Sequence, residues 1–317
     1  MAGGVPARIV VVGGINMDVH LFGADEQQPD RPLLVDHYLT EPGGKGANVA
    51  RAAARLGARV SLVGRVGEDA FGRACLAALD DDGVDVTGVL VTPDEPTGFV
   101  SIELENGLHR SLVYVPGAND ALTWSDVAPA VERLTTGDIL IVQAEIPPET
   151  LRRITERTAE DGVRLYLDPA PPDRVPLATL RAAEAVTPDR AEAAALTGRV
   201  DSSQVWPALA AAELRALGAR CVIVKTGASG AVLAVDGDVA GIPTLAVEAV
   251  DETGAGDVFI AALAVRRAEG AGWQEAVRFA NAASAISVSA PGLSLPARAQ
   301  VDAATATLTA PATRLLQ

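Results

Sequence analysis

The chain has 317 residues, 49% hydrophobic and 21% charged, so it is long enough for one large α/β domain or two smaller ones. Its formal net charge of −15 argues against nucleic acid or an anionic membrane as the main partner, because both favour a basic surface. Cys75 and Cys221 lie in apolar segments that predict buried thiols, and with no membrane-length apolar run and no secretory signal we expect a cytoplasmic protein.

The N-terminal part of the chain alternates between strand-like and helical segments. Residues 8–13 form an apolar run that ends at a glycine, as in a strand buried on both faces of a parallel sheet. Residues 44–56 are alanine-rich and are followed by Gly57, which predicts a helix with a C-terminal glycine. A strand at 60–63 and a helix at 68–79 follow, and this alternation is typical of an α/β fold.

The segment 97–115 departs from this alternation. It contains two β-rich stretches on either side of Asn106-Gly107, a strong hairpin signal. The stretches 19–22 and 33–38 are also strand-like and have no obvious helical partner. An ordinary edge hairpin and a separate small sheet explain this pattern equally well. We expect a small antiparallel sheet that projects as a lid or a dimer surface and is formed by about residues 17–40 and 97–116.

The alternation resumes in the C-terminal half. Apolar runs at 139–142, 163–167 and 221–224 predict further buried strands. Helical patterns lie between or beside them at 148–161, 190–196 and 205–217. The chain therefore predicts a doubly wound, mostly parallel sheet flanked by helices, in a single domain that spans 1–317.

The segment 251–257, which reads DETGAGD, carries the clearest functional signal. It precedes the apolar run 258–263 and predicts a glycine-rich turn that opens a buried helix. The backbone N–H groups at a helix N-terminus bind phosphate well, and Asp257 would place a base beside that phosphate. A simpler alternative is that Asp257 only caps the helix. The segment therefore suggests transfer of a phosphoryl group to a hydroxyl.

Two further segments suggest a small polar ligand. Residues 43–48, GGKGAN, lack the P-loop spacing, but Asn48 one turn into the helix could bind hydroxyl groups. A plain glycine-rich helix entry is the alternative reading. Asn16 and Asp18 follow the first strand, where ligands bind in open α/β sheets, although an Asx turn explains them as well.

Taken together, these segments resemble the ribokinase-like (PfkB) family of carbohydrate kinases. Residues 43–48 resemble its N-terminal signature and 251–257 its C-terminal signature, and the resemblance covers nearly the whole chain. Smaller landmarks occur between and after the two signatures in the expected order: 143–145, 168–171, 187–189 with Glu192, 226–227 with Gly230, and Asn281.

The resemblance implies roles for individual residues. Asp257 would be the catalytic base, beside an anion hole formed by Gly254, Ala255 and Gly256. The sugar would be bound by Asn16, Asp18, Gly43, Gly44, Lys45, Asn48, Glu145 and Asp257. The nucleotide would contact Asp189, Gly256, Lys225, Thr226, Gly227, Ser229, Gly230 and Asn281, with 225–230 and Asn281 lining its base and ribose. Glu192 would hold Mg²⁺ through water, and a monovalent cation, K⁺, would be surrounded by Asp251, Thr253, Ser287, Ala290 and Gly292.

The chain departs from the family pattern at four places. Asp189 stands where the family usually has Asn, and this extra carboxylate would repel a triphosphate or attract metal. Glu252 stands where Thr is common. The stretch after Gly292 is about two residues short, and residues 23–31 lack the expected Pro-Gly-Glu run.

The resemblance implies transfer of the ATP γ-phosphoryl group to the primary hydroxyl of a small sugar, with ribose as the leading acceptor. The alternatives are fructose or another ketose, a 2-keto-3-deoxy sugar acid, a nucleoside, or a non-catalytic sugar or nucleotide sensor. A dinucleotide-dependent oxidoreductase would need GxGxxG after the first strand, which residues 13–18 do not supply. We expect a homodimer formed through the small sheet, and neither nucleic acid nor a membrane as a partner.

Overall fold

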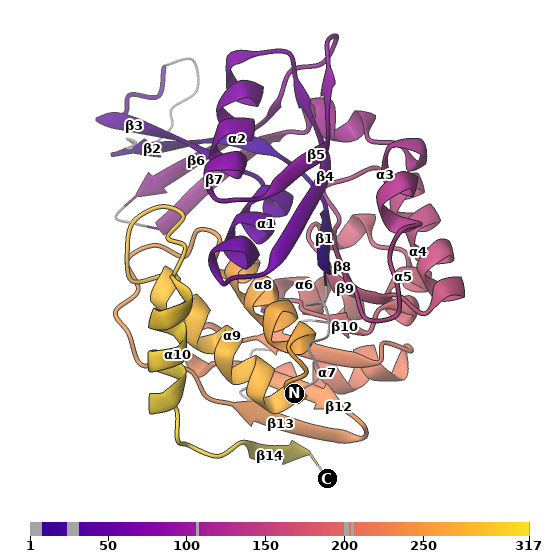
Figure 1. Cartoon of the computed structure of the whole chain (residues 1–317). Coiled ribbons are helices and arrows are strands. Elements are labelled where there is room, and N and C mark those ends of the chain that lie inside the picture. The colour runs from indigo at the N-terminus through magenta and orange to yellow at the C-terminus, as the bar shows by residue number, and fades with distance from the viewer. Residues whose placement is uncertain (1–7, 24–31, 106–107, 200–202, 204–205, 317) are drawn as a thin grey trace.

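The structure is a computed structural model that describes residues 8–23, 32–105, 108–199, 203 and 206–316. It contains a large ten-stranded sheet with helices on both faces, and a four-stranded sheet that projects to one side (Figure 1). The predicted α/β fold with a small additional sheet is therefore confirmed. Among the described residues, no helix combines the length and the hydropathy that are needed to cross a bilayer.

The large sheet has the strand order β14-β13-β12-β11-β10-β9-β8-β1-β4-β5. All pairings from β5 to β11 are parallel, and the three pairings from β11 to β14 are antiparallel. The sheet is thus mostly parallel, as predicted. Its strands are β1 (Arg8–Val12), β4 (Arg59–Gly67), β5 (Asp85–Thr92), β8 (Ile139–Gln143), β9 (Arg164–Asp168), β10 (Ala185–Val186), β11 (Cys221–Lys225), β12 (Ala231–Val235), β13 (Asp238–Ile242) and β14 (Thr313–Leu316).

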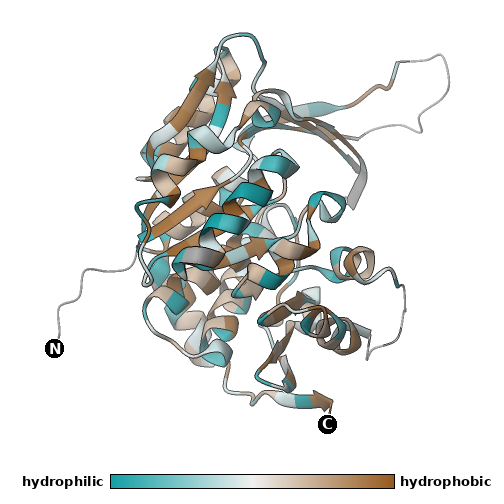
Figure 2. Cartoon of the chain, turned by 90° about the vertical axis from the view of Figure 1, so that its right-hand side faces the viewer, coloured by the Kyte–Doolittle hydropathy of each residue, from teal (hydrophilic) through white to brown (hydrophobic). Residues whose placement is uncertain are grey.

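The central strands are apolar throughout because both faces of the sheet are covered. In β1, Ile9 and Val11 pack into one core while Val10 and Val12 pack into the other. Successive side chains of a strand point to opposite faces, so a strand between two helical layers needs an uninterrupted apolar sequence. Figure 2 shows this concentration of hydrophobic residues in the strands.

Two groups of helices form these layers. The helices α1, α2, α8, α9 and α10 contribute to one core, and α3 to α7 contribute to the other. Their bounds are α1 (Lys45–Arg55), α2 (Ala70–Asp81), α3 (Trp124–Val131), α4 (Pro148–Asp161), α5 (Leu177–Ala182), α6 (Arg190–Thr197), α7 (Trp206–Ala216), α8 (Ala255–Ala268), α9 (Trp273–Ser287) and α10 (Arg298–Thr307), with 3₁₀ helices η1 (Gly117–Ala121), η2 (Pro172–Arg174) and η3 (Gly227–Ser229).

The predicted helices are present with small shifts at their ends. The helix predicted from 68 begins at Ala70, because the Asp69 side chain caps it by accepting from the Gly72 N–H at 2.7 Å. The helix predicted from 205 is described from Trp206, and Val205 itself lies outside the described residues. The helices α3, α5, α9 and α10 were not predicted as elements from the sequence pattern.

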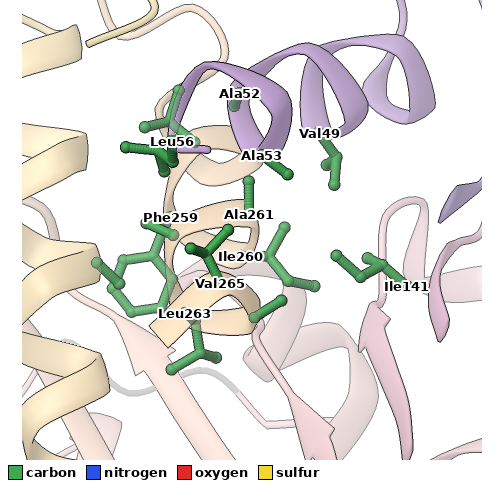
Figure 3. Close-up of a cluster of buried hydrophobic side chains, with 14 of the residues drawn as sticks. Val49, Ala52, Ala53, Leu56, Ile141, Phe259, Ile260, Ala261, Leu263 and Val265 are labelled. Atoms are coloured by element: carbon green, nitrogen blue, oxygen red, sulfur yellow. The ribbon is translucent and has the colours of Figure 1, made fainter. Parts of the chain in front are cut away.

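The contact between α1 and α8 positions the two signature segments relative to each other. Small and branched side chains, among them Val49, Ala53, Ile260 and Ala261, interdigitate between the two helices (Figure 3). All four are at most 2% exposed. Alanines at a helix contact allow a close approach of the two backbones, so the N-terminal turns of α1 and α8 are held in a fixed relation.

The small sheet has the order β3-β2-β6-β7, from strands β2 (Asn16–Phe22), β3 (His37–Gly43), β6 (Gly98–Glu105) and β7 (Leu108–Val115). Its outer pairings are antiparallel as expected, whereas the central pairing of β2 with β6 is parallel. The strand predicted at 33–38 begins only at His37, which pairs with Phe22, the last residue of β2. The predicted hairpin turn at 106–107 and the unusual segment 24–31 lie outside the described residues.

Candidate active site

The predicted site residues gather at the carboxyl edge of the large sheet. β1, β8, β9 and β11 belong to one parallel array, so their carboxyl ends share this edge. Asn16 follows β1 and Glu145 follows β8, while Asp168 ends β9 and Lys225 ends β11. In open α/β sheets this edge is where ligands bind.

The glycine-rich turn opens α8 and carries a buried carboxylate. Gly254 caps the helix with φ of 71°, a left-handed conformation that favours glycine. Asp257 lies in the first helical turn and is buried, and its Oδ2 accepts a hydrogen bond from Asn48 Nδ2 at 2.9 Å. The Ala255 N–H donates to the Glu252 carbonyl at 3.2 Å. Asp257 is therefore held at the positive end of α8 and fixed by α1.

A charged network extends from Asp257 toward α6. Lys45 Nζ lies 3.7 Å from Asp257 Oδ1 and 3.9 Å from Asp168 Oδ2. Lys225 Nζ lies 3.5 Å from Asp168 Oδ1 and 3.9 Å from Glu192 Oε2. The two lysines are the only ones in the sequence, and both neighbour Asp168. The fully buried Asp168 is thus the central member of this charged network.

The network shifts the pKa values of its members. Burial raises the pKa of Asp257, with Lys45 opposing the shift in part. Burial also raises the pKa of Glu192, again against an opposing lysine, Lys225. Burial disfavours the charge of each lysine, but the neighbouring carboxylates hold both lysine pKa values above the ordinary value. A carboxylate with a raised pKa is a stronger proton acceptor once it is ionised, which suits a general base.

Lys225 lies beside the first turn of α8. A Cβ at Gly256 would be only 3.0 Å from Lys225 Nζ. A lysine beside a helix N-terminus favours binding of an anionic group such as a phosphoryl group. The resemblance, in contrast, implies that Lys225 contacts the base and the ribose of the nucleotide. The geometry therefore brings Lys225 closer to the predicted phosphoryl cradle than its expected role implies.

Asn16 and Glu145 form the other half of the site. Glu145 Oε2 accepts from Asn16 Nδ2 and from the backbone N–H of Lys45, both at 3.4 Å. The backbone N–H of Glu145 donates to Gln143 Oε1 at 2.5 Å, which fixes the chain where it leaves β8. Asn16 Oδ1 in turn accepts from Asn119 Nδ2 at 2.7 Å. Hydrogen bonds among these polar side chains and the nearby backbone therefore fix their orientations.

Two carboxyl groups of this half have pKa values near neutrality. Burial raises the pKa of Asp18 on β2 to about 7, and the charges of Glu145 and Asp257 add to the effect. Burial likewise raises the pKa of Glu145 to about 7, although Lys45 opposes it. Asp18 Oδ1 has no hydrogen-bond partner among the described residues. Such groups can accept hydrogen bonds from the hydroxyls of a sugar.

The predicted nucleotide residues hold backbone turns together. Thr226 Oγ1 donates to the Gly230 carbonyl at 2.9 Å and closes the turn around η3. Asn281 Nδ2 donates to the carbonyls of Ile242 and Pro243, both at 3.0 Å. The Gly230 backbone lies directly against the Ile242 carbonyl. Because Asn281 of α9 donates to the same carbonyl, the η3 turn packs against both the end of β13 and α9. The remaining predicted residues of the turn, Gly227 and Ser229, are exposed.

Asp189 is the N-cap of α6. Its Oδ1 accepts from the Glu192 N–H at 2.8 Å, and its own N–H donates to Glu192 Oε2 at 2.7 Å. This is a capping box, in which the two side chains satisfy each other's backbone donors. The departure from the family pattern therefore has a local structural role, because the Asp189 side chain caps α6, while the backbone N–H of the same residue holds the Glu192 carboxylate, which lies beside Lys225.

The predicted cation residues lie in two loops that Asp251 joins. Asp251 Oδ1 accepts from the Thr253 N–H at 2.8 Å, and Oδ2 accepts from the Gly292 N–H at 2.9 Å. Burial works against the charge of Asp251, but these hydrogen bonds lower its pKa. Ser287 ends α9 and Ala290 follows it, between Ser287 and Gly292. The Asp251 carboxylate thus holds the two loop backbones together. Glu252, which stands where the family commonly has Thr, is exposed.

Two residues of this site are missing from the set predicted by sequence. Asp168 enters there only as a landmark, although a polar residue at the carboxyl end of a buried parallel strand is itself a signal for a site. Asn119 lies in η1 after the small sheet, and its local sequence does not distinguish it from an ordinary turn asparagine.

Comparison with known proteins assigns the family. The sequence model described as "pfkB family carbohydrate kinase" matches residues 6–300. The chain is 35% identical over 297 residues to the ribokinase of Bacillus subtilis (strain 168), which covers 93% of this chain and 98% of that protein. The structure of Arabidopsis thaliana ribokinase complexed with ribose and ATP is similar at a TM-score of 0.84, with 31% identity over 95% of this chain and 99% of that one. Phosphofructokinase-2 from Escherichia coli in complex with potassium gives a TM-score of 0.80, with 25% identity over 96% and 100% of the two chains. The chain belongs to the pfkB family of carbohydrate kinases.

Proposed function

We propose that this carbohydrate kinase phosphorylates ribose, transferring the γ-phosphoryl group of ATP to the primary hydroxyl of the sugar. The observation that carries the proposal is the buried Asp257 at the N-terminus of α8, fixed by Asn48 and neighboured by Lys45. The similarity to ribokinases, one of them complexed with ribose and ATP, supports the choice of acceptor.

Two groups of residues would bind the two substrates. The acceptor side comprises Asn16, Asp18, Gly43, Gly44, Lys45, Asn48 and Glu145. The nucleotide side comprises Asp189, Lys225, Thr226, Gly227, Ser229, Gly230 and Asn281. Asp257 and the turn Gly254–Gly256 lie between them and would belong to both.

The chemistry follows from these positions. Asp257 accepts the proton of the sugar hydroxyl while the hydroxyl oxygen forms a bond to the γ-phosphorus, and the bond from that phosphorus to the leaving oxygen of ADP breaks. The raised pKa of Asp257 strengthens it as a base. The backbone N–H groups at the start of α8, together with Lys225, stabilise the charge on the transferred group. Lys45 opposes this rise in pKa and so favours the ionised form of Asp257.

Mg²⁺ would accompany the triphosphate near Glu192, bound through water. The three carboxylates of the charged network outnumber its two lysines, and oxygen ligands of this kind suit a hard divalent cation. When bound, the ion would supply charge neutralisation to the phosphate oxygens. The capping box of Asp189 would keep Glu192 in place for this contact.

A monovalent cation, K⁺, would bind between the two loops that Asp251 joins. The Asp251 carboxylate would supply oxygen ligands together with Thr253, Ser287, Ala290 and Gly292, and an all-oxygen donor set fits an alkali cation. The potassium complex of a family member at 25% identity supports the choice of ion. The loops adjoin Gly254, so the cation would stabilise the turn that binds the phosphoryl group.

We further propose that two copies associate through the small sheet, which would also cover the sugar site as a lid. The sheet exposes Tyr38, Leu39, Leu112, Val113 and Val115, each more than 40% accessible. They lie on β3 and β7, the two outer strands of the sheet, and exposed apolar side chains on one sheet are typical of an interface. Sedimentation analysis would show a dimer for the wild-type protein and a monomer for Leu112→Lys, and a wild-type monomer would contradict this proposal.

We propose a cytoplasmic location, which agrees with the proposed kinase activity. Cys75 and Cys221 are buried and free, as is usual for proteins of a reducing compartment. ATP as the phosphoryl donor is also a cytoplasmic metabolite. Detection of the tagged protein in a membrane or secreted fraction would contradict this location.

An assay of ADP release tests the activity directly. Ribose, fructose, a 2-keto-3-deoxy sugar acid and adenosine would be compared with ATP and Mg²⁺, each with K⁺ or with Na⁺. We expect the largest kcat/KM for ribose, with little ADP released in the absence of any acceptor. A larger kcat/KM for another acceptor would reassign the substrate, and a lack of response to every acceptor would favour a sensor.

A further inference from the structure

Asn119 lies where the small sheet returns to the main domain. It stands in η1, just after β7, and is only 1% exposed. Its amide spans the backbone of Ile15, since Oδ1 accepts from the Ile15 N–H at 2.9 Å and Nδ2 donates to the Ile15 carbonyl at 3.2 Å. The same Nδ2 donates to Asn16 Oδ1 at 2.7 Å. The buried Asn119 amide therefore contacts both the backbone before Asn16 and the Asn16 side chain, which belongs to the acceptor side.

The backbone of Ile15 determines which way both amides face. An N–H group only donates, so the Asn119 atom opposite it must be the oxygen, and the Asn119 nitrogen then faces Asn16. Because that nitrogen only donates, the Asn16 atom opposite it must be the oxygen. Asn16 Nδ2 is left facing Glu145 Oε2 at 3.4 Å. Asn119 thus sets the orientation of the Asn16 side chain.

Gly98 on β6 packs against the side-chain amides of Asn16 and Asn119. It is the partner of Asn16 in the pairing of β2 with β6. A Cβ at this position would clash with Asn16 Oδ1 and with Asn119 Nδ2. Glycine at a strand position often marks a close approach of this kind. The strands β2 and β6 and the 3₁₀ helix η1 therefore hold one arrangement of the two amides.

We propose that Asn119 is a positioning residue that makes Asn16 present its Nδ2 donor, and not its carbonyl oxygen, to the acceptor sugar. The inference rests on the proposed function, in which Asn16 binds that sugar. A hydroxyl oxygen can accept from Asn16 Nδ2 while its own proton is donated to the Glu145 carboxylate. A reversed Asn16 amide would place two acceptors side by side and weaken recognition of that hydroxyl.

Substitution of Asn119 tests this arrangement. Asn119→Asp keeps the size and the acceptor for the Ile15 N–H, but it replaces the donor beside Asn16 Oδ1 with a second acceptor and so favours the reversed amide. Asn119→Ala removes the restraint without favouring either orientation. We expect the KM for ribose to rise about tenfold in Asn119→Asp and less in Asn119→Ala, while the KM for ATP changes less than about twofold.

A panel of monodeoxyriboses supplies a measurement that a purely structural role would not change. The wild-type protein should discriminate most against the sugar that lacks the hydroxyl contacted by Asn16. In Asn119→Asp that discrimination should fall toward unity, while the discrimination at the other hydroxyls is kept. Gly98→Ala should reduce the same discrimination without a substitution of either asparagine, because its Cβ would clash with Asn16 Oδ1 and Asn119 Nδ2, and it serves as the second variant if Asn119→Asp does not fold.

Thr179→Val is the matched control. It removes one buried side-chain hydrogen bond, that of Thr179 with Thr155 at 2.8 Å, between α4 and α5 and outside the proposed site. It should lower Tm and leave the sugar KM and the deoxysugar discrimination unchanged. If the Asn119 and Gly98 variants behave like this control, the inference is wrong. Absence of ribose turnover by the wild-type protein would instead contradict the proposed function, and the panel's preferred acceptor would then take the place of ribose in the same comparison.

Discussion

On the acceptor side, Asn16 and Glu145 hydrogen-bond through their side chains, and Asp18 has a buried oxygen that no residue in the described part of the chain contacts by a hydrogen bond. On the nucleotide side, the side chains of Thr226 and Asn281 donate to backbone carbonyls and hold turns together. In the proposed function, the acceptor side would therefore offer functional groups of particular residues to the sugar. The nucleotide side would mainly offer backbone whose shape those residues maintain.

This contrast predicts different consequences of substitution on the two sides. A change on the acceptor side would remove or reverse a group that is proposed to contact the sugar, so it should alter selectivity and the chemical step. A change on the nucleotide side should first alter the stability of a turn. The charged network joins the two sides, and its members should show both effects.

Asp257→Asn tests the point where the two sides meet and should have the largest effect. The amide keeps the size of the side chain but cannot take the proton of the hydroxyl. General-base catalysis contributes about 10²- to 10⁴-fold, so kcat should fall by that factor. ATP affinity, measured by calorimetry, should stay within about threefold because binding of the nucleotide does not need the base. An unchanged kcat would rule out Asp257 as the base.

Asp168→Asn tests whether the charged network couples the two sides. Removal of the central carboxylate leaves Lys45 and Lys225 without their shared partner. Loss of one member of a buried ion pair costs about 3–5 kcal/mol, and the partial exposure of the lysines reduces this to about 2–3 kcal/mol of unfolding free energy here. We also expect the KM values of both substrates to rise, since each lysine lies on a different side.

Asp138→Asn is the matched control for Asp168. Asp138 is also buried and pairs with an arginine, Arg8, but it lies at the opposite end of the sheet from the site. The control should lose stability in urea unfolding while both KM values stay constant. If Asp168→Asn behaves in the same way, the network has a structural role only.

Asp18→Asn separates stability from function on the acceptor side through its pH dependence. The folded-state pKa of Asp18 is about 7 against an ordinary value of 3.8, so the folded state binds the proton more tightly than the unfolded state. This group therefore favours folding at low pH, and its contribution is lost as the pH rises from about 4 to about 7. A rise of this size corresponds to about 4 kcal/mol, and we expect about 2–4 kcal/mol because neighbouring carboxyls titrate together.

Thermal unfolding at two pH values measures this effect. Asp18→Asn should be more stable than the wild-type protein at about pH 8 and nearly equal to it at about pH 4, while its turnover of ribose falls. A stability difference that does not depend on pH would contradict the raised pKa. The comparison is made without ligand, because bound sugar would stabilise the two proteins unequally.

The large sheet and its helices could be predicted from the sequence because their signals are local. The apolar run at 8–13, the alanine-rich helix at 44–56 and the glycine turn at 251–257 each carry a pattern that their own residues establish. The parallel pairing of β2 with β6 could not be predicted in this way. It joins segments more than 80 positions apart, and no local pattern determines which strands become neighbours.

The same distinction applies to the site. Asp257 and Asn48 stand in motifs and were predicted, and their hydrogen bond is consistent with the roles given to them. Asn119 and Asp168 contact residues far away in the chain, Asn119 at Ile15 and Asp168 at the two lysines. Their importance depends on the packed structure, because an asparagine in a turn and an aspartate before a proline are common in any sequence.

Asp189 gives the smallest expected effect and tests the nucleotide side. Asp189→Asn keeps an oxygen that can accept from the Glu192 N–H, so the cap of α6 should survive and the unfolding free energy should change by less than about 0.5 kcal/mol. Asp189→Ala removes the cap and should cost about 1 kcal/mol. Loss of the side-chain cap would loosen the first turn of α6, which carries Glu192, so we expect Asp189→Ala to raise the Mg²⁺ concentration needed for half-maximal activity, and Asp189→Asn to leave it unchanged. A fall of several-fold in the KM for ATP in Asp189→Asn would show instead that the negative charge of Asp189 repels the triphosphate, and that this side chain acts on the nucleotide directly and not through the backbone of α6.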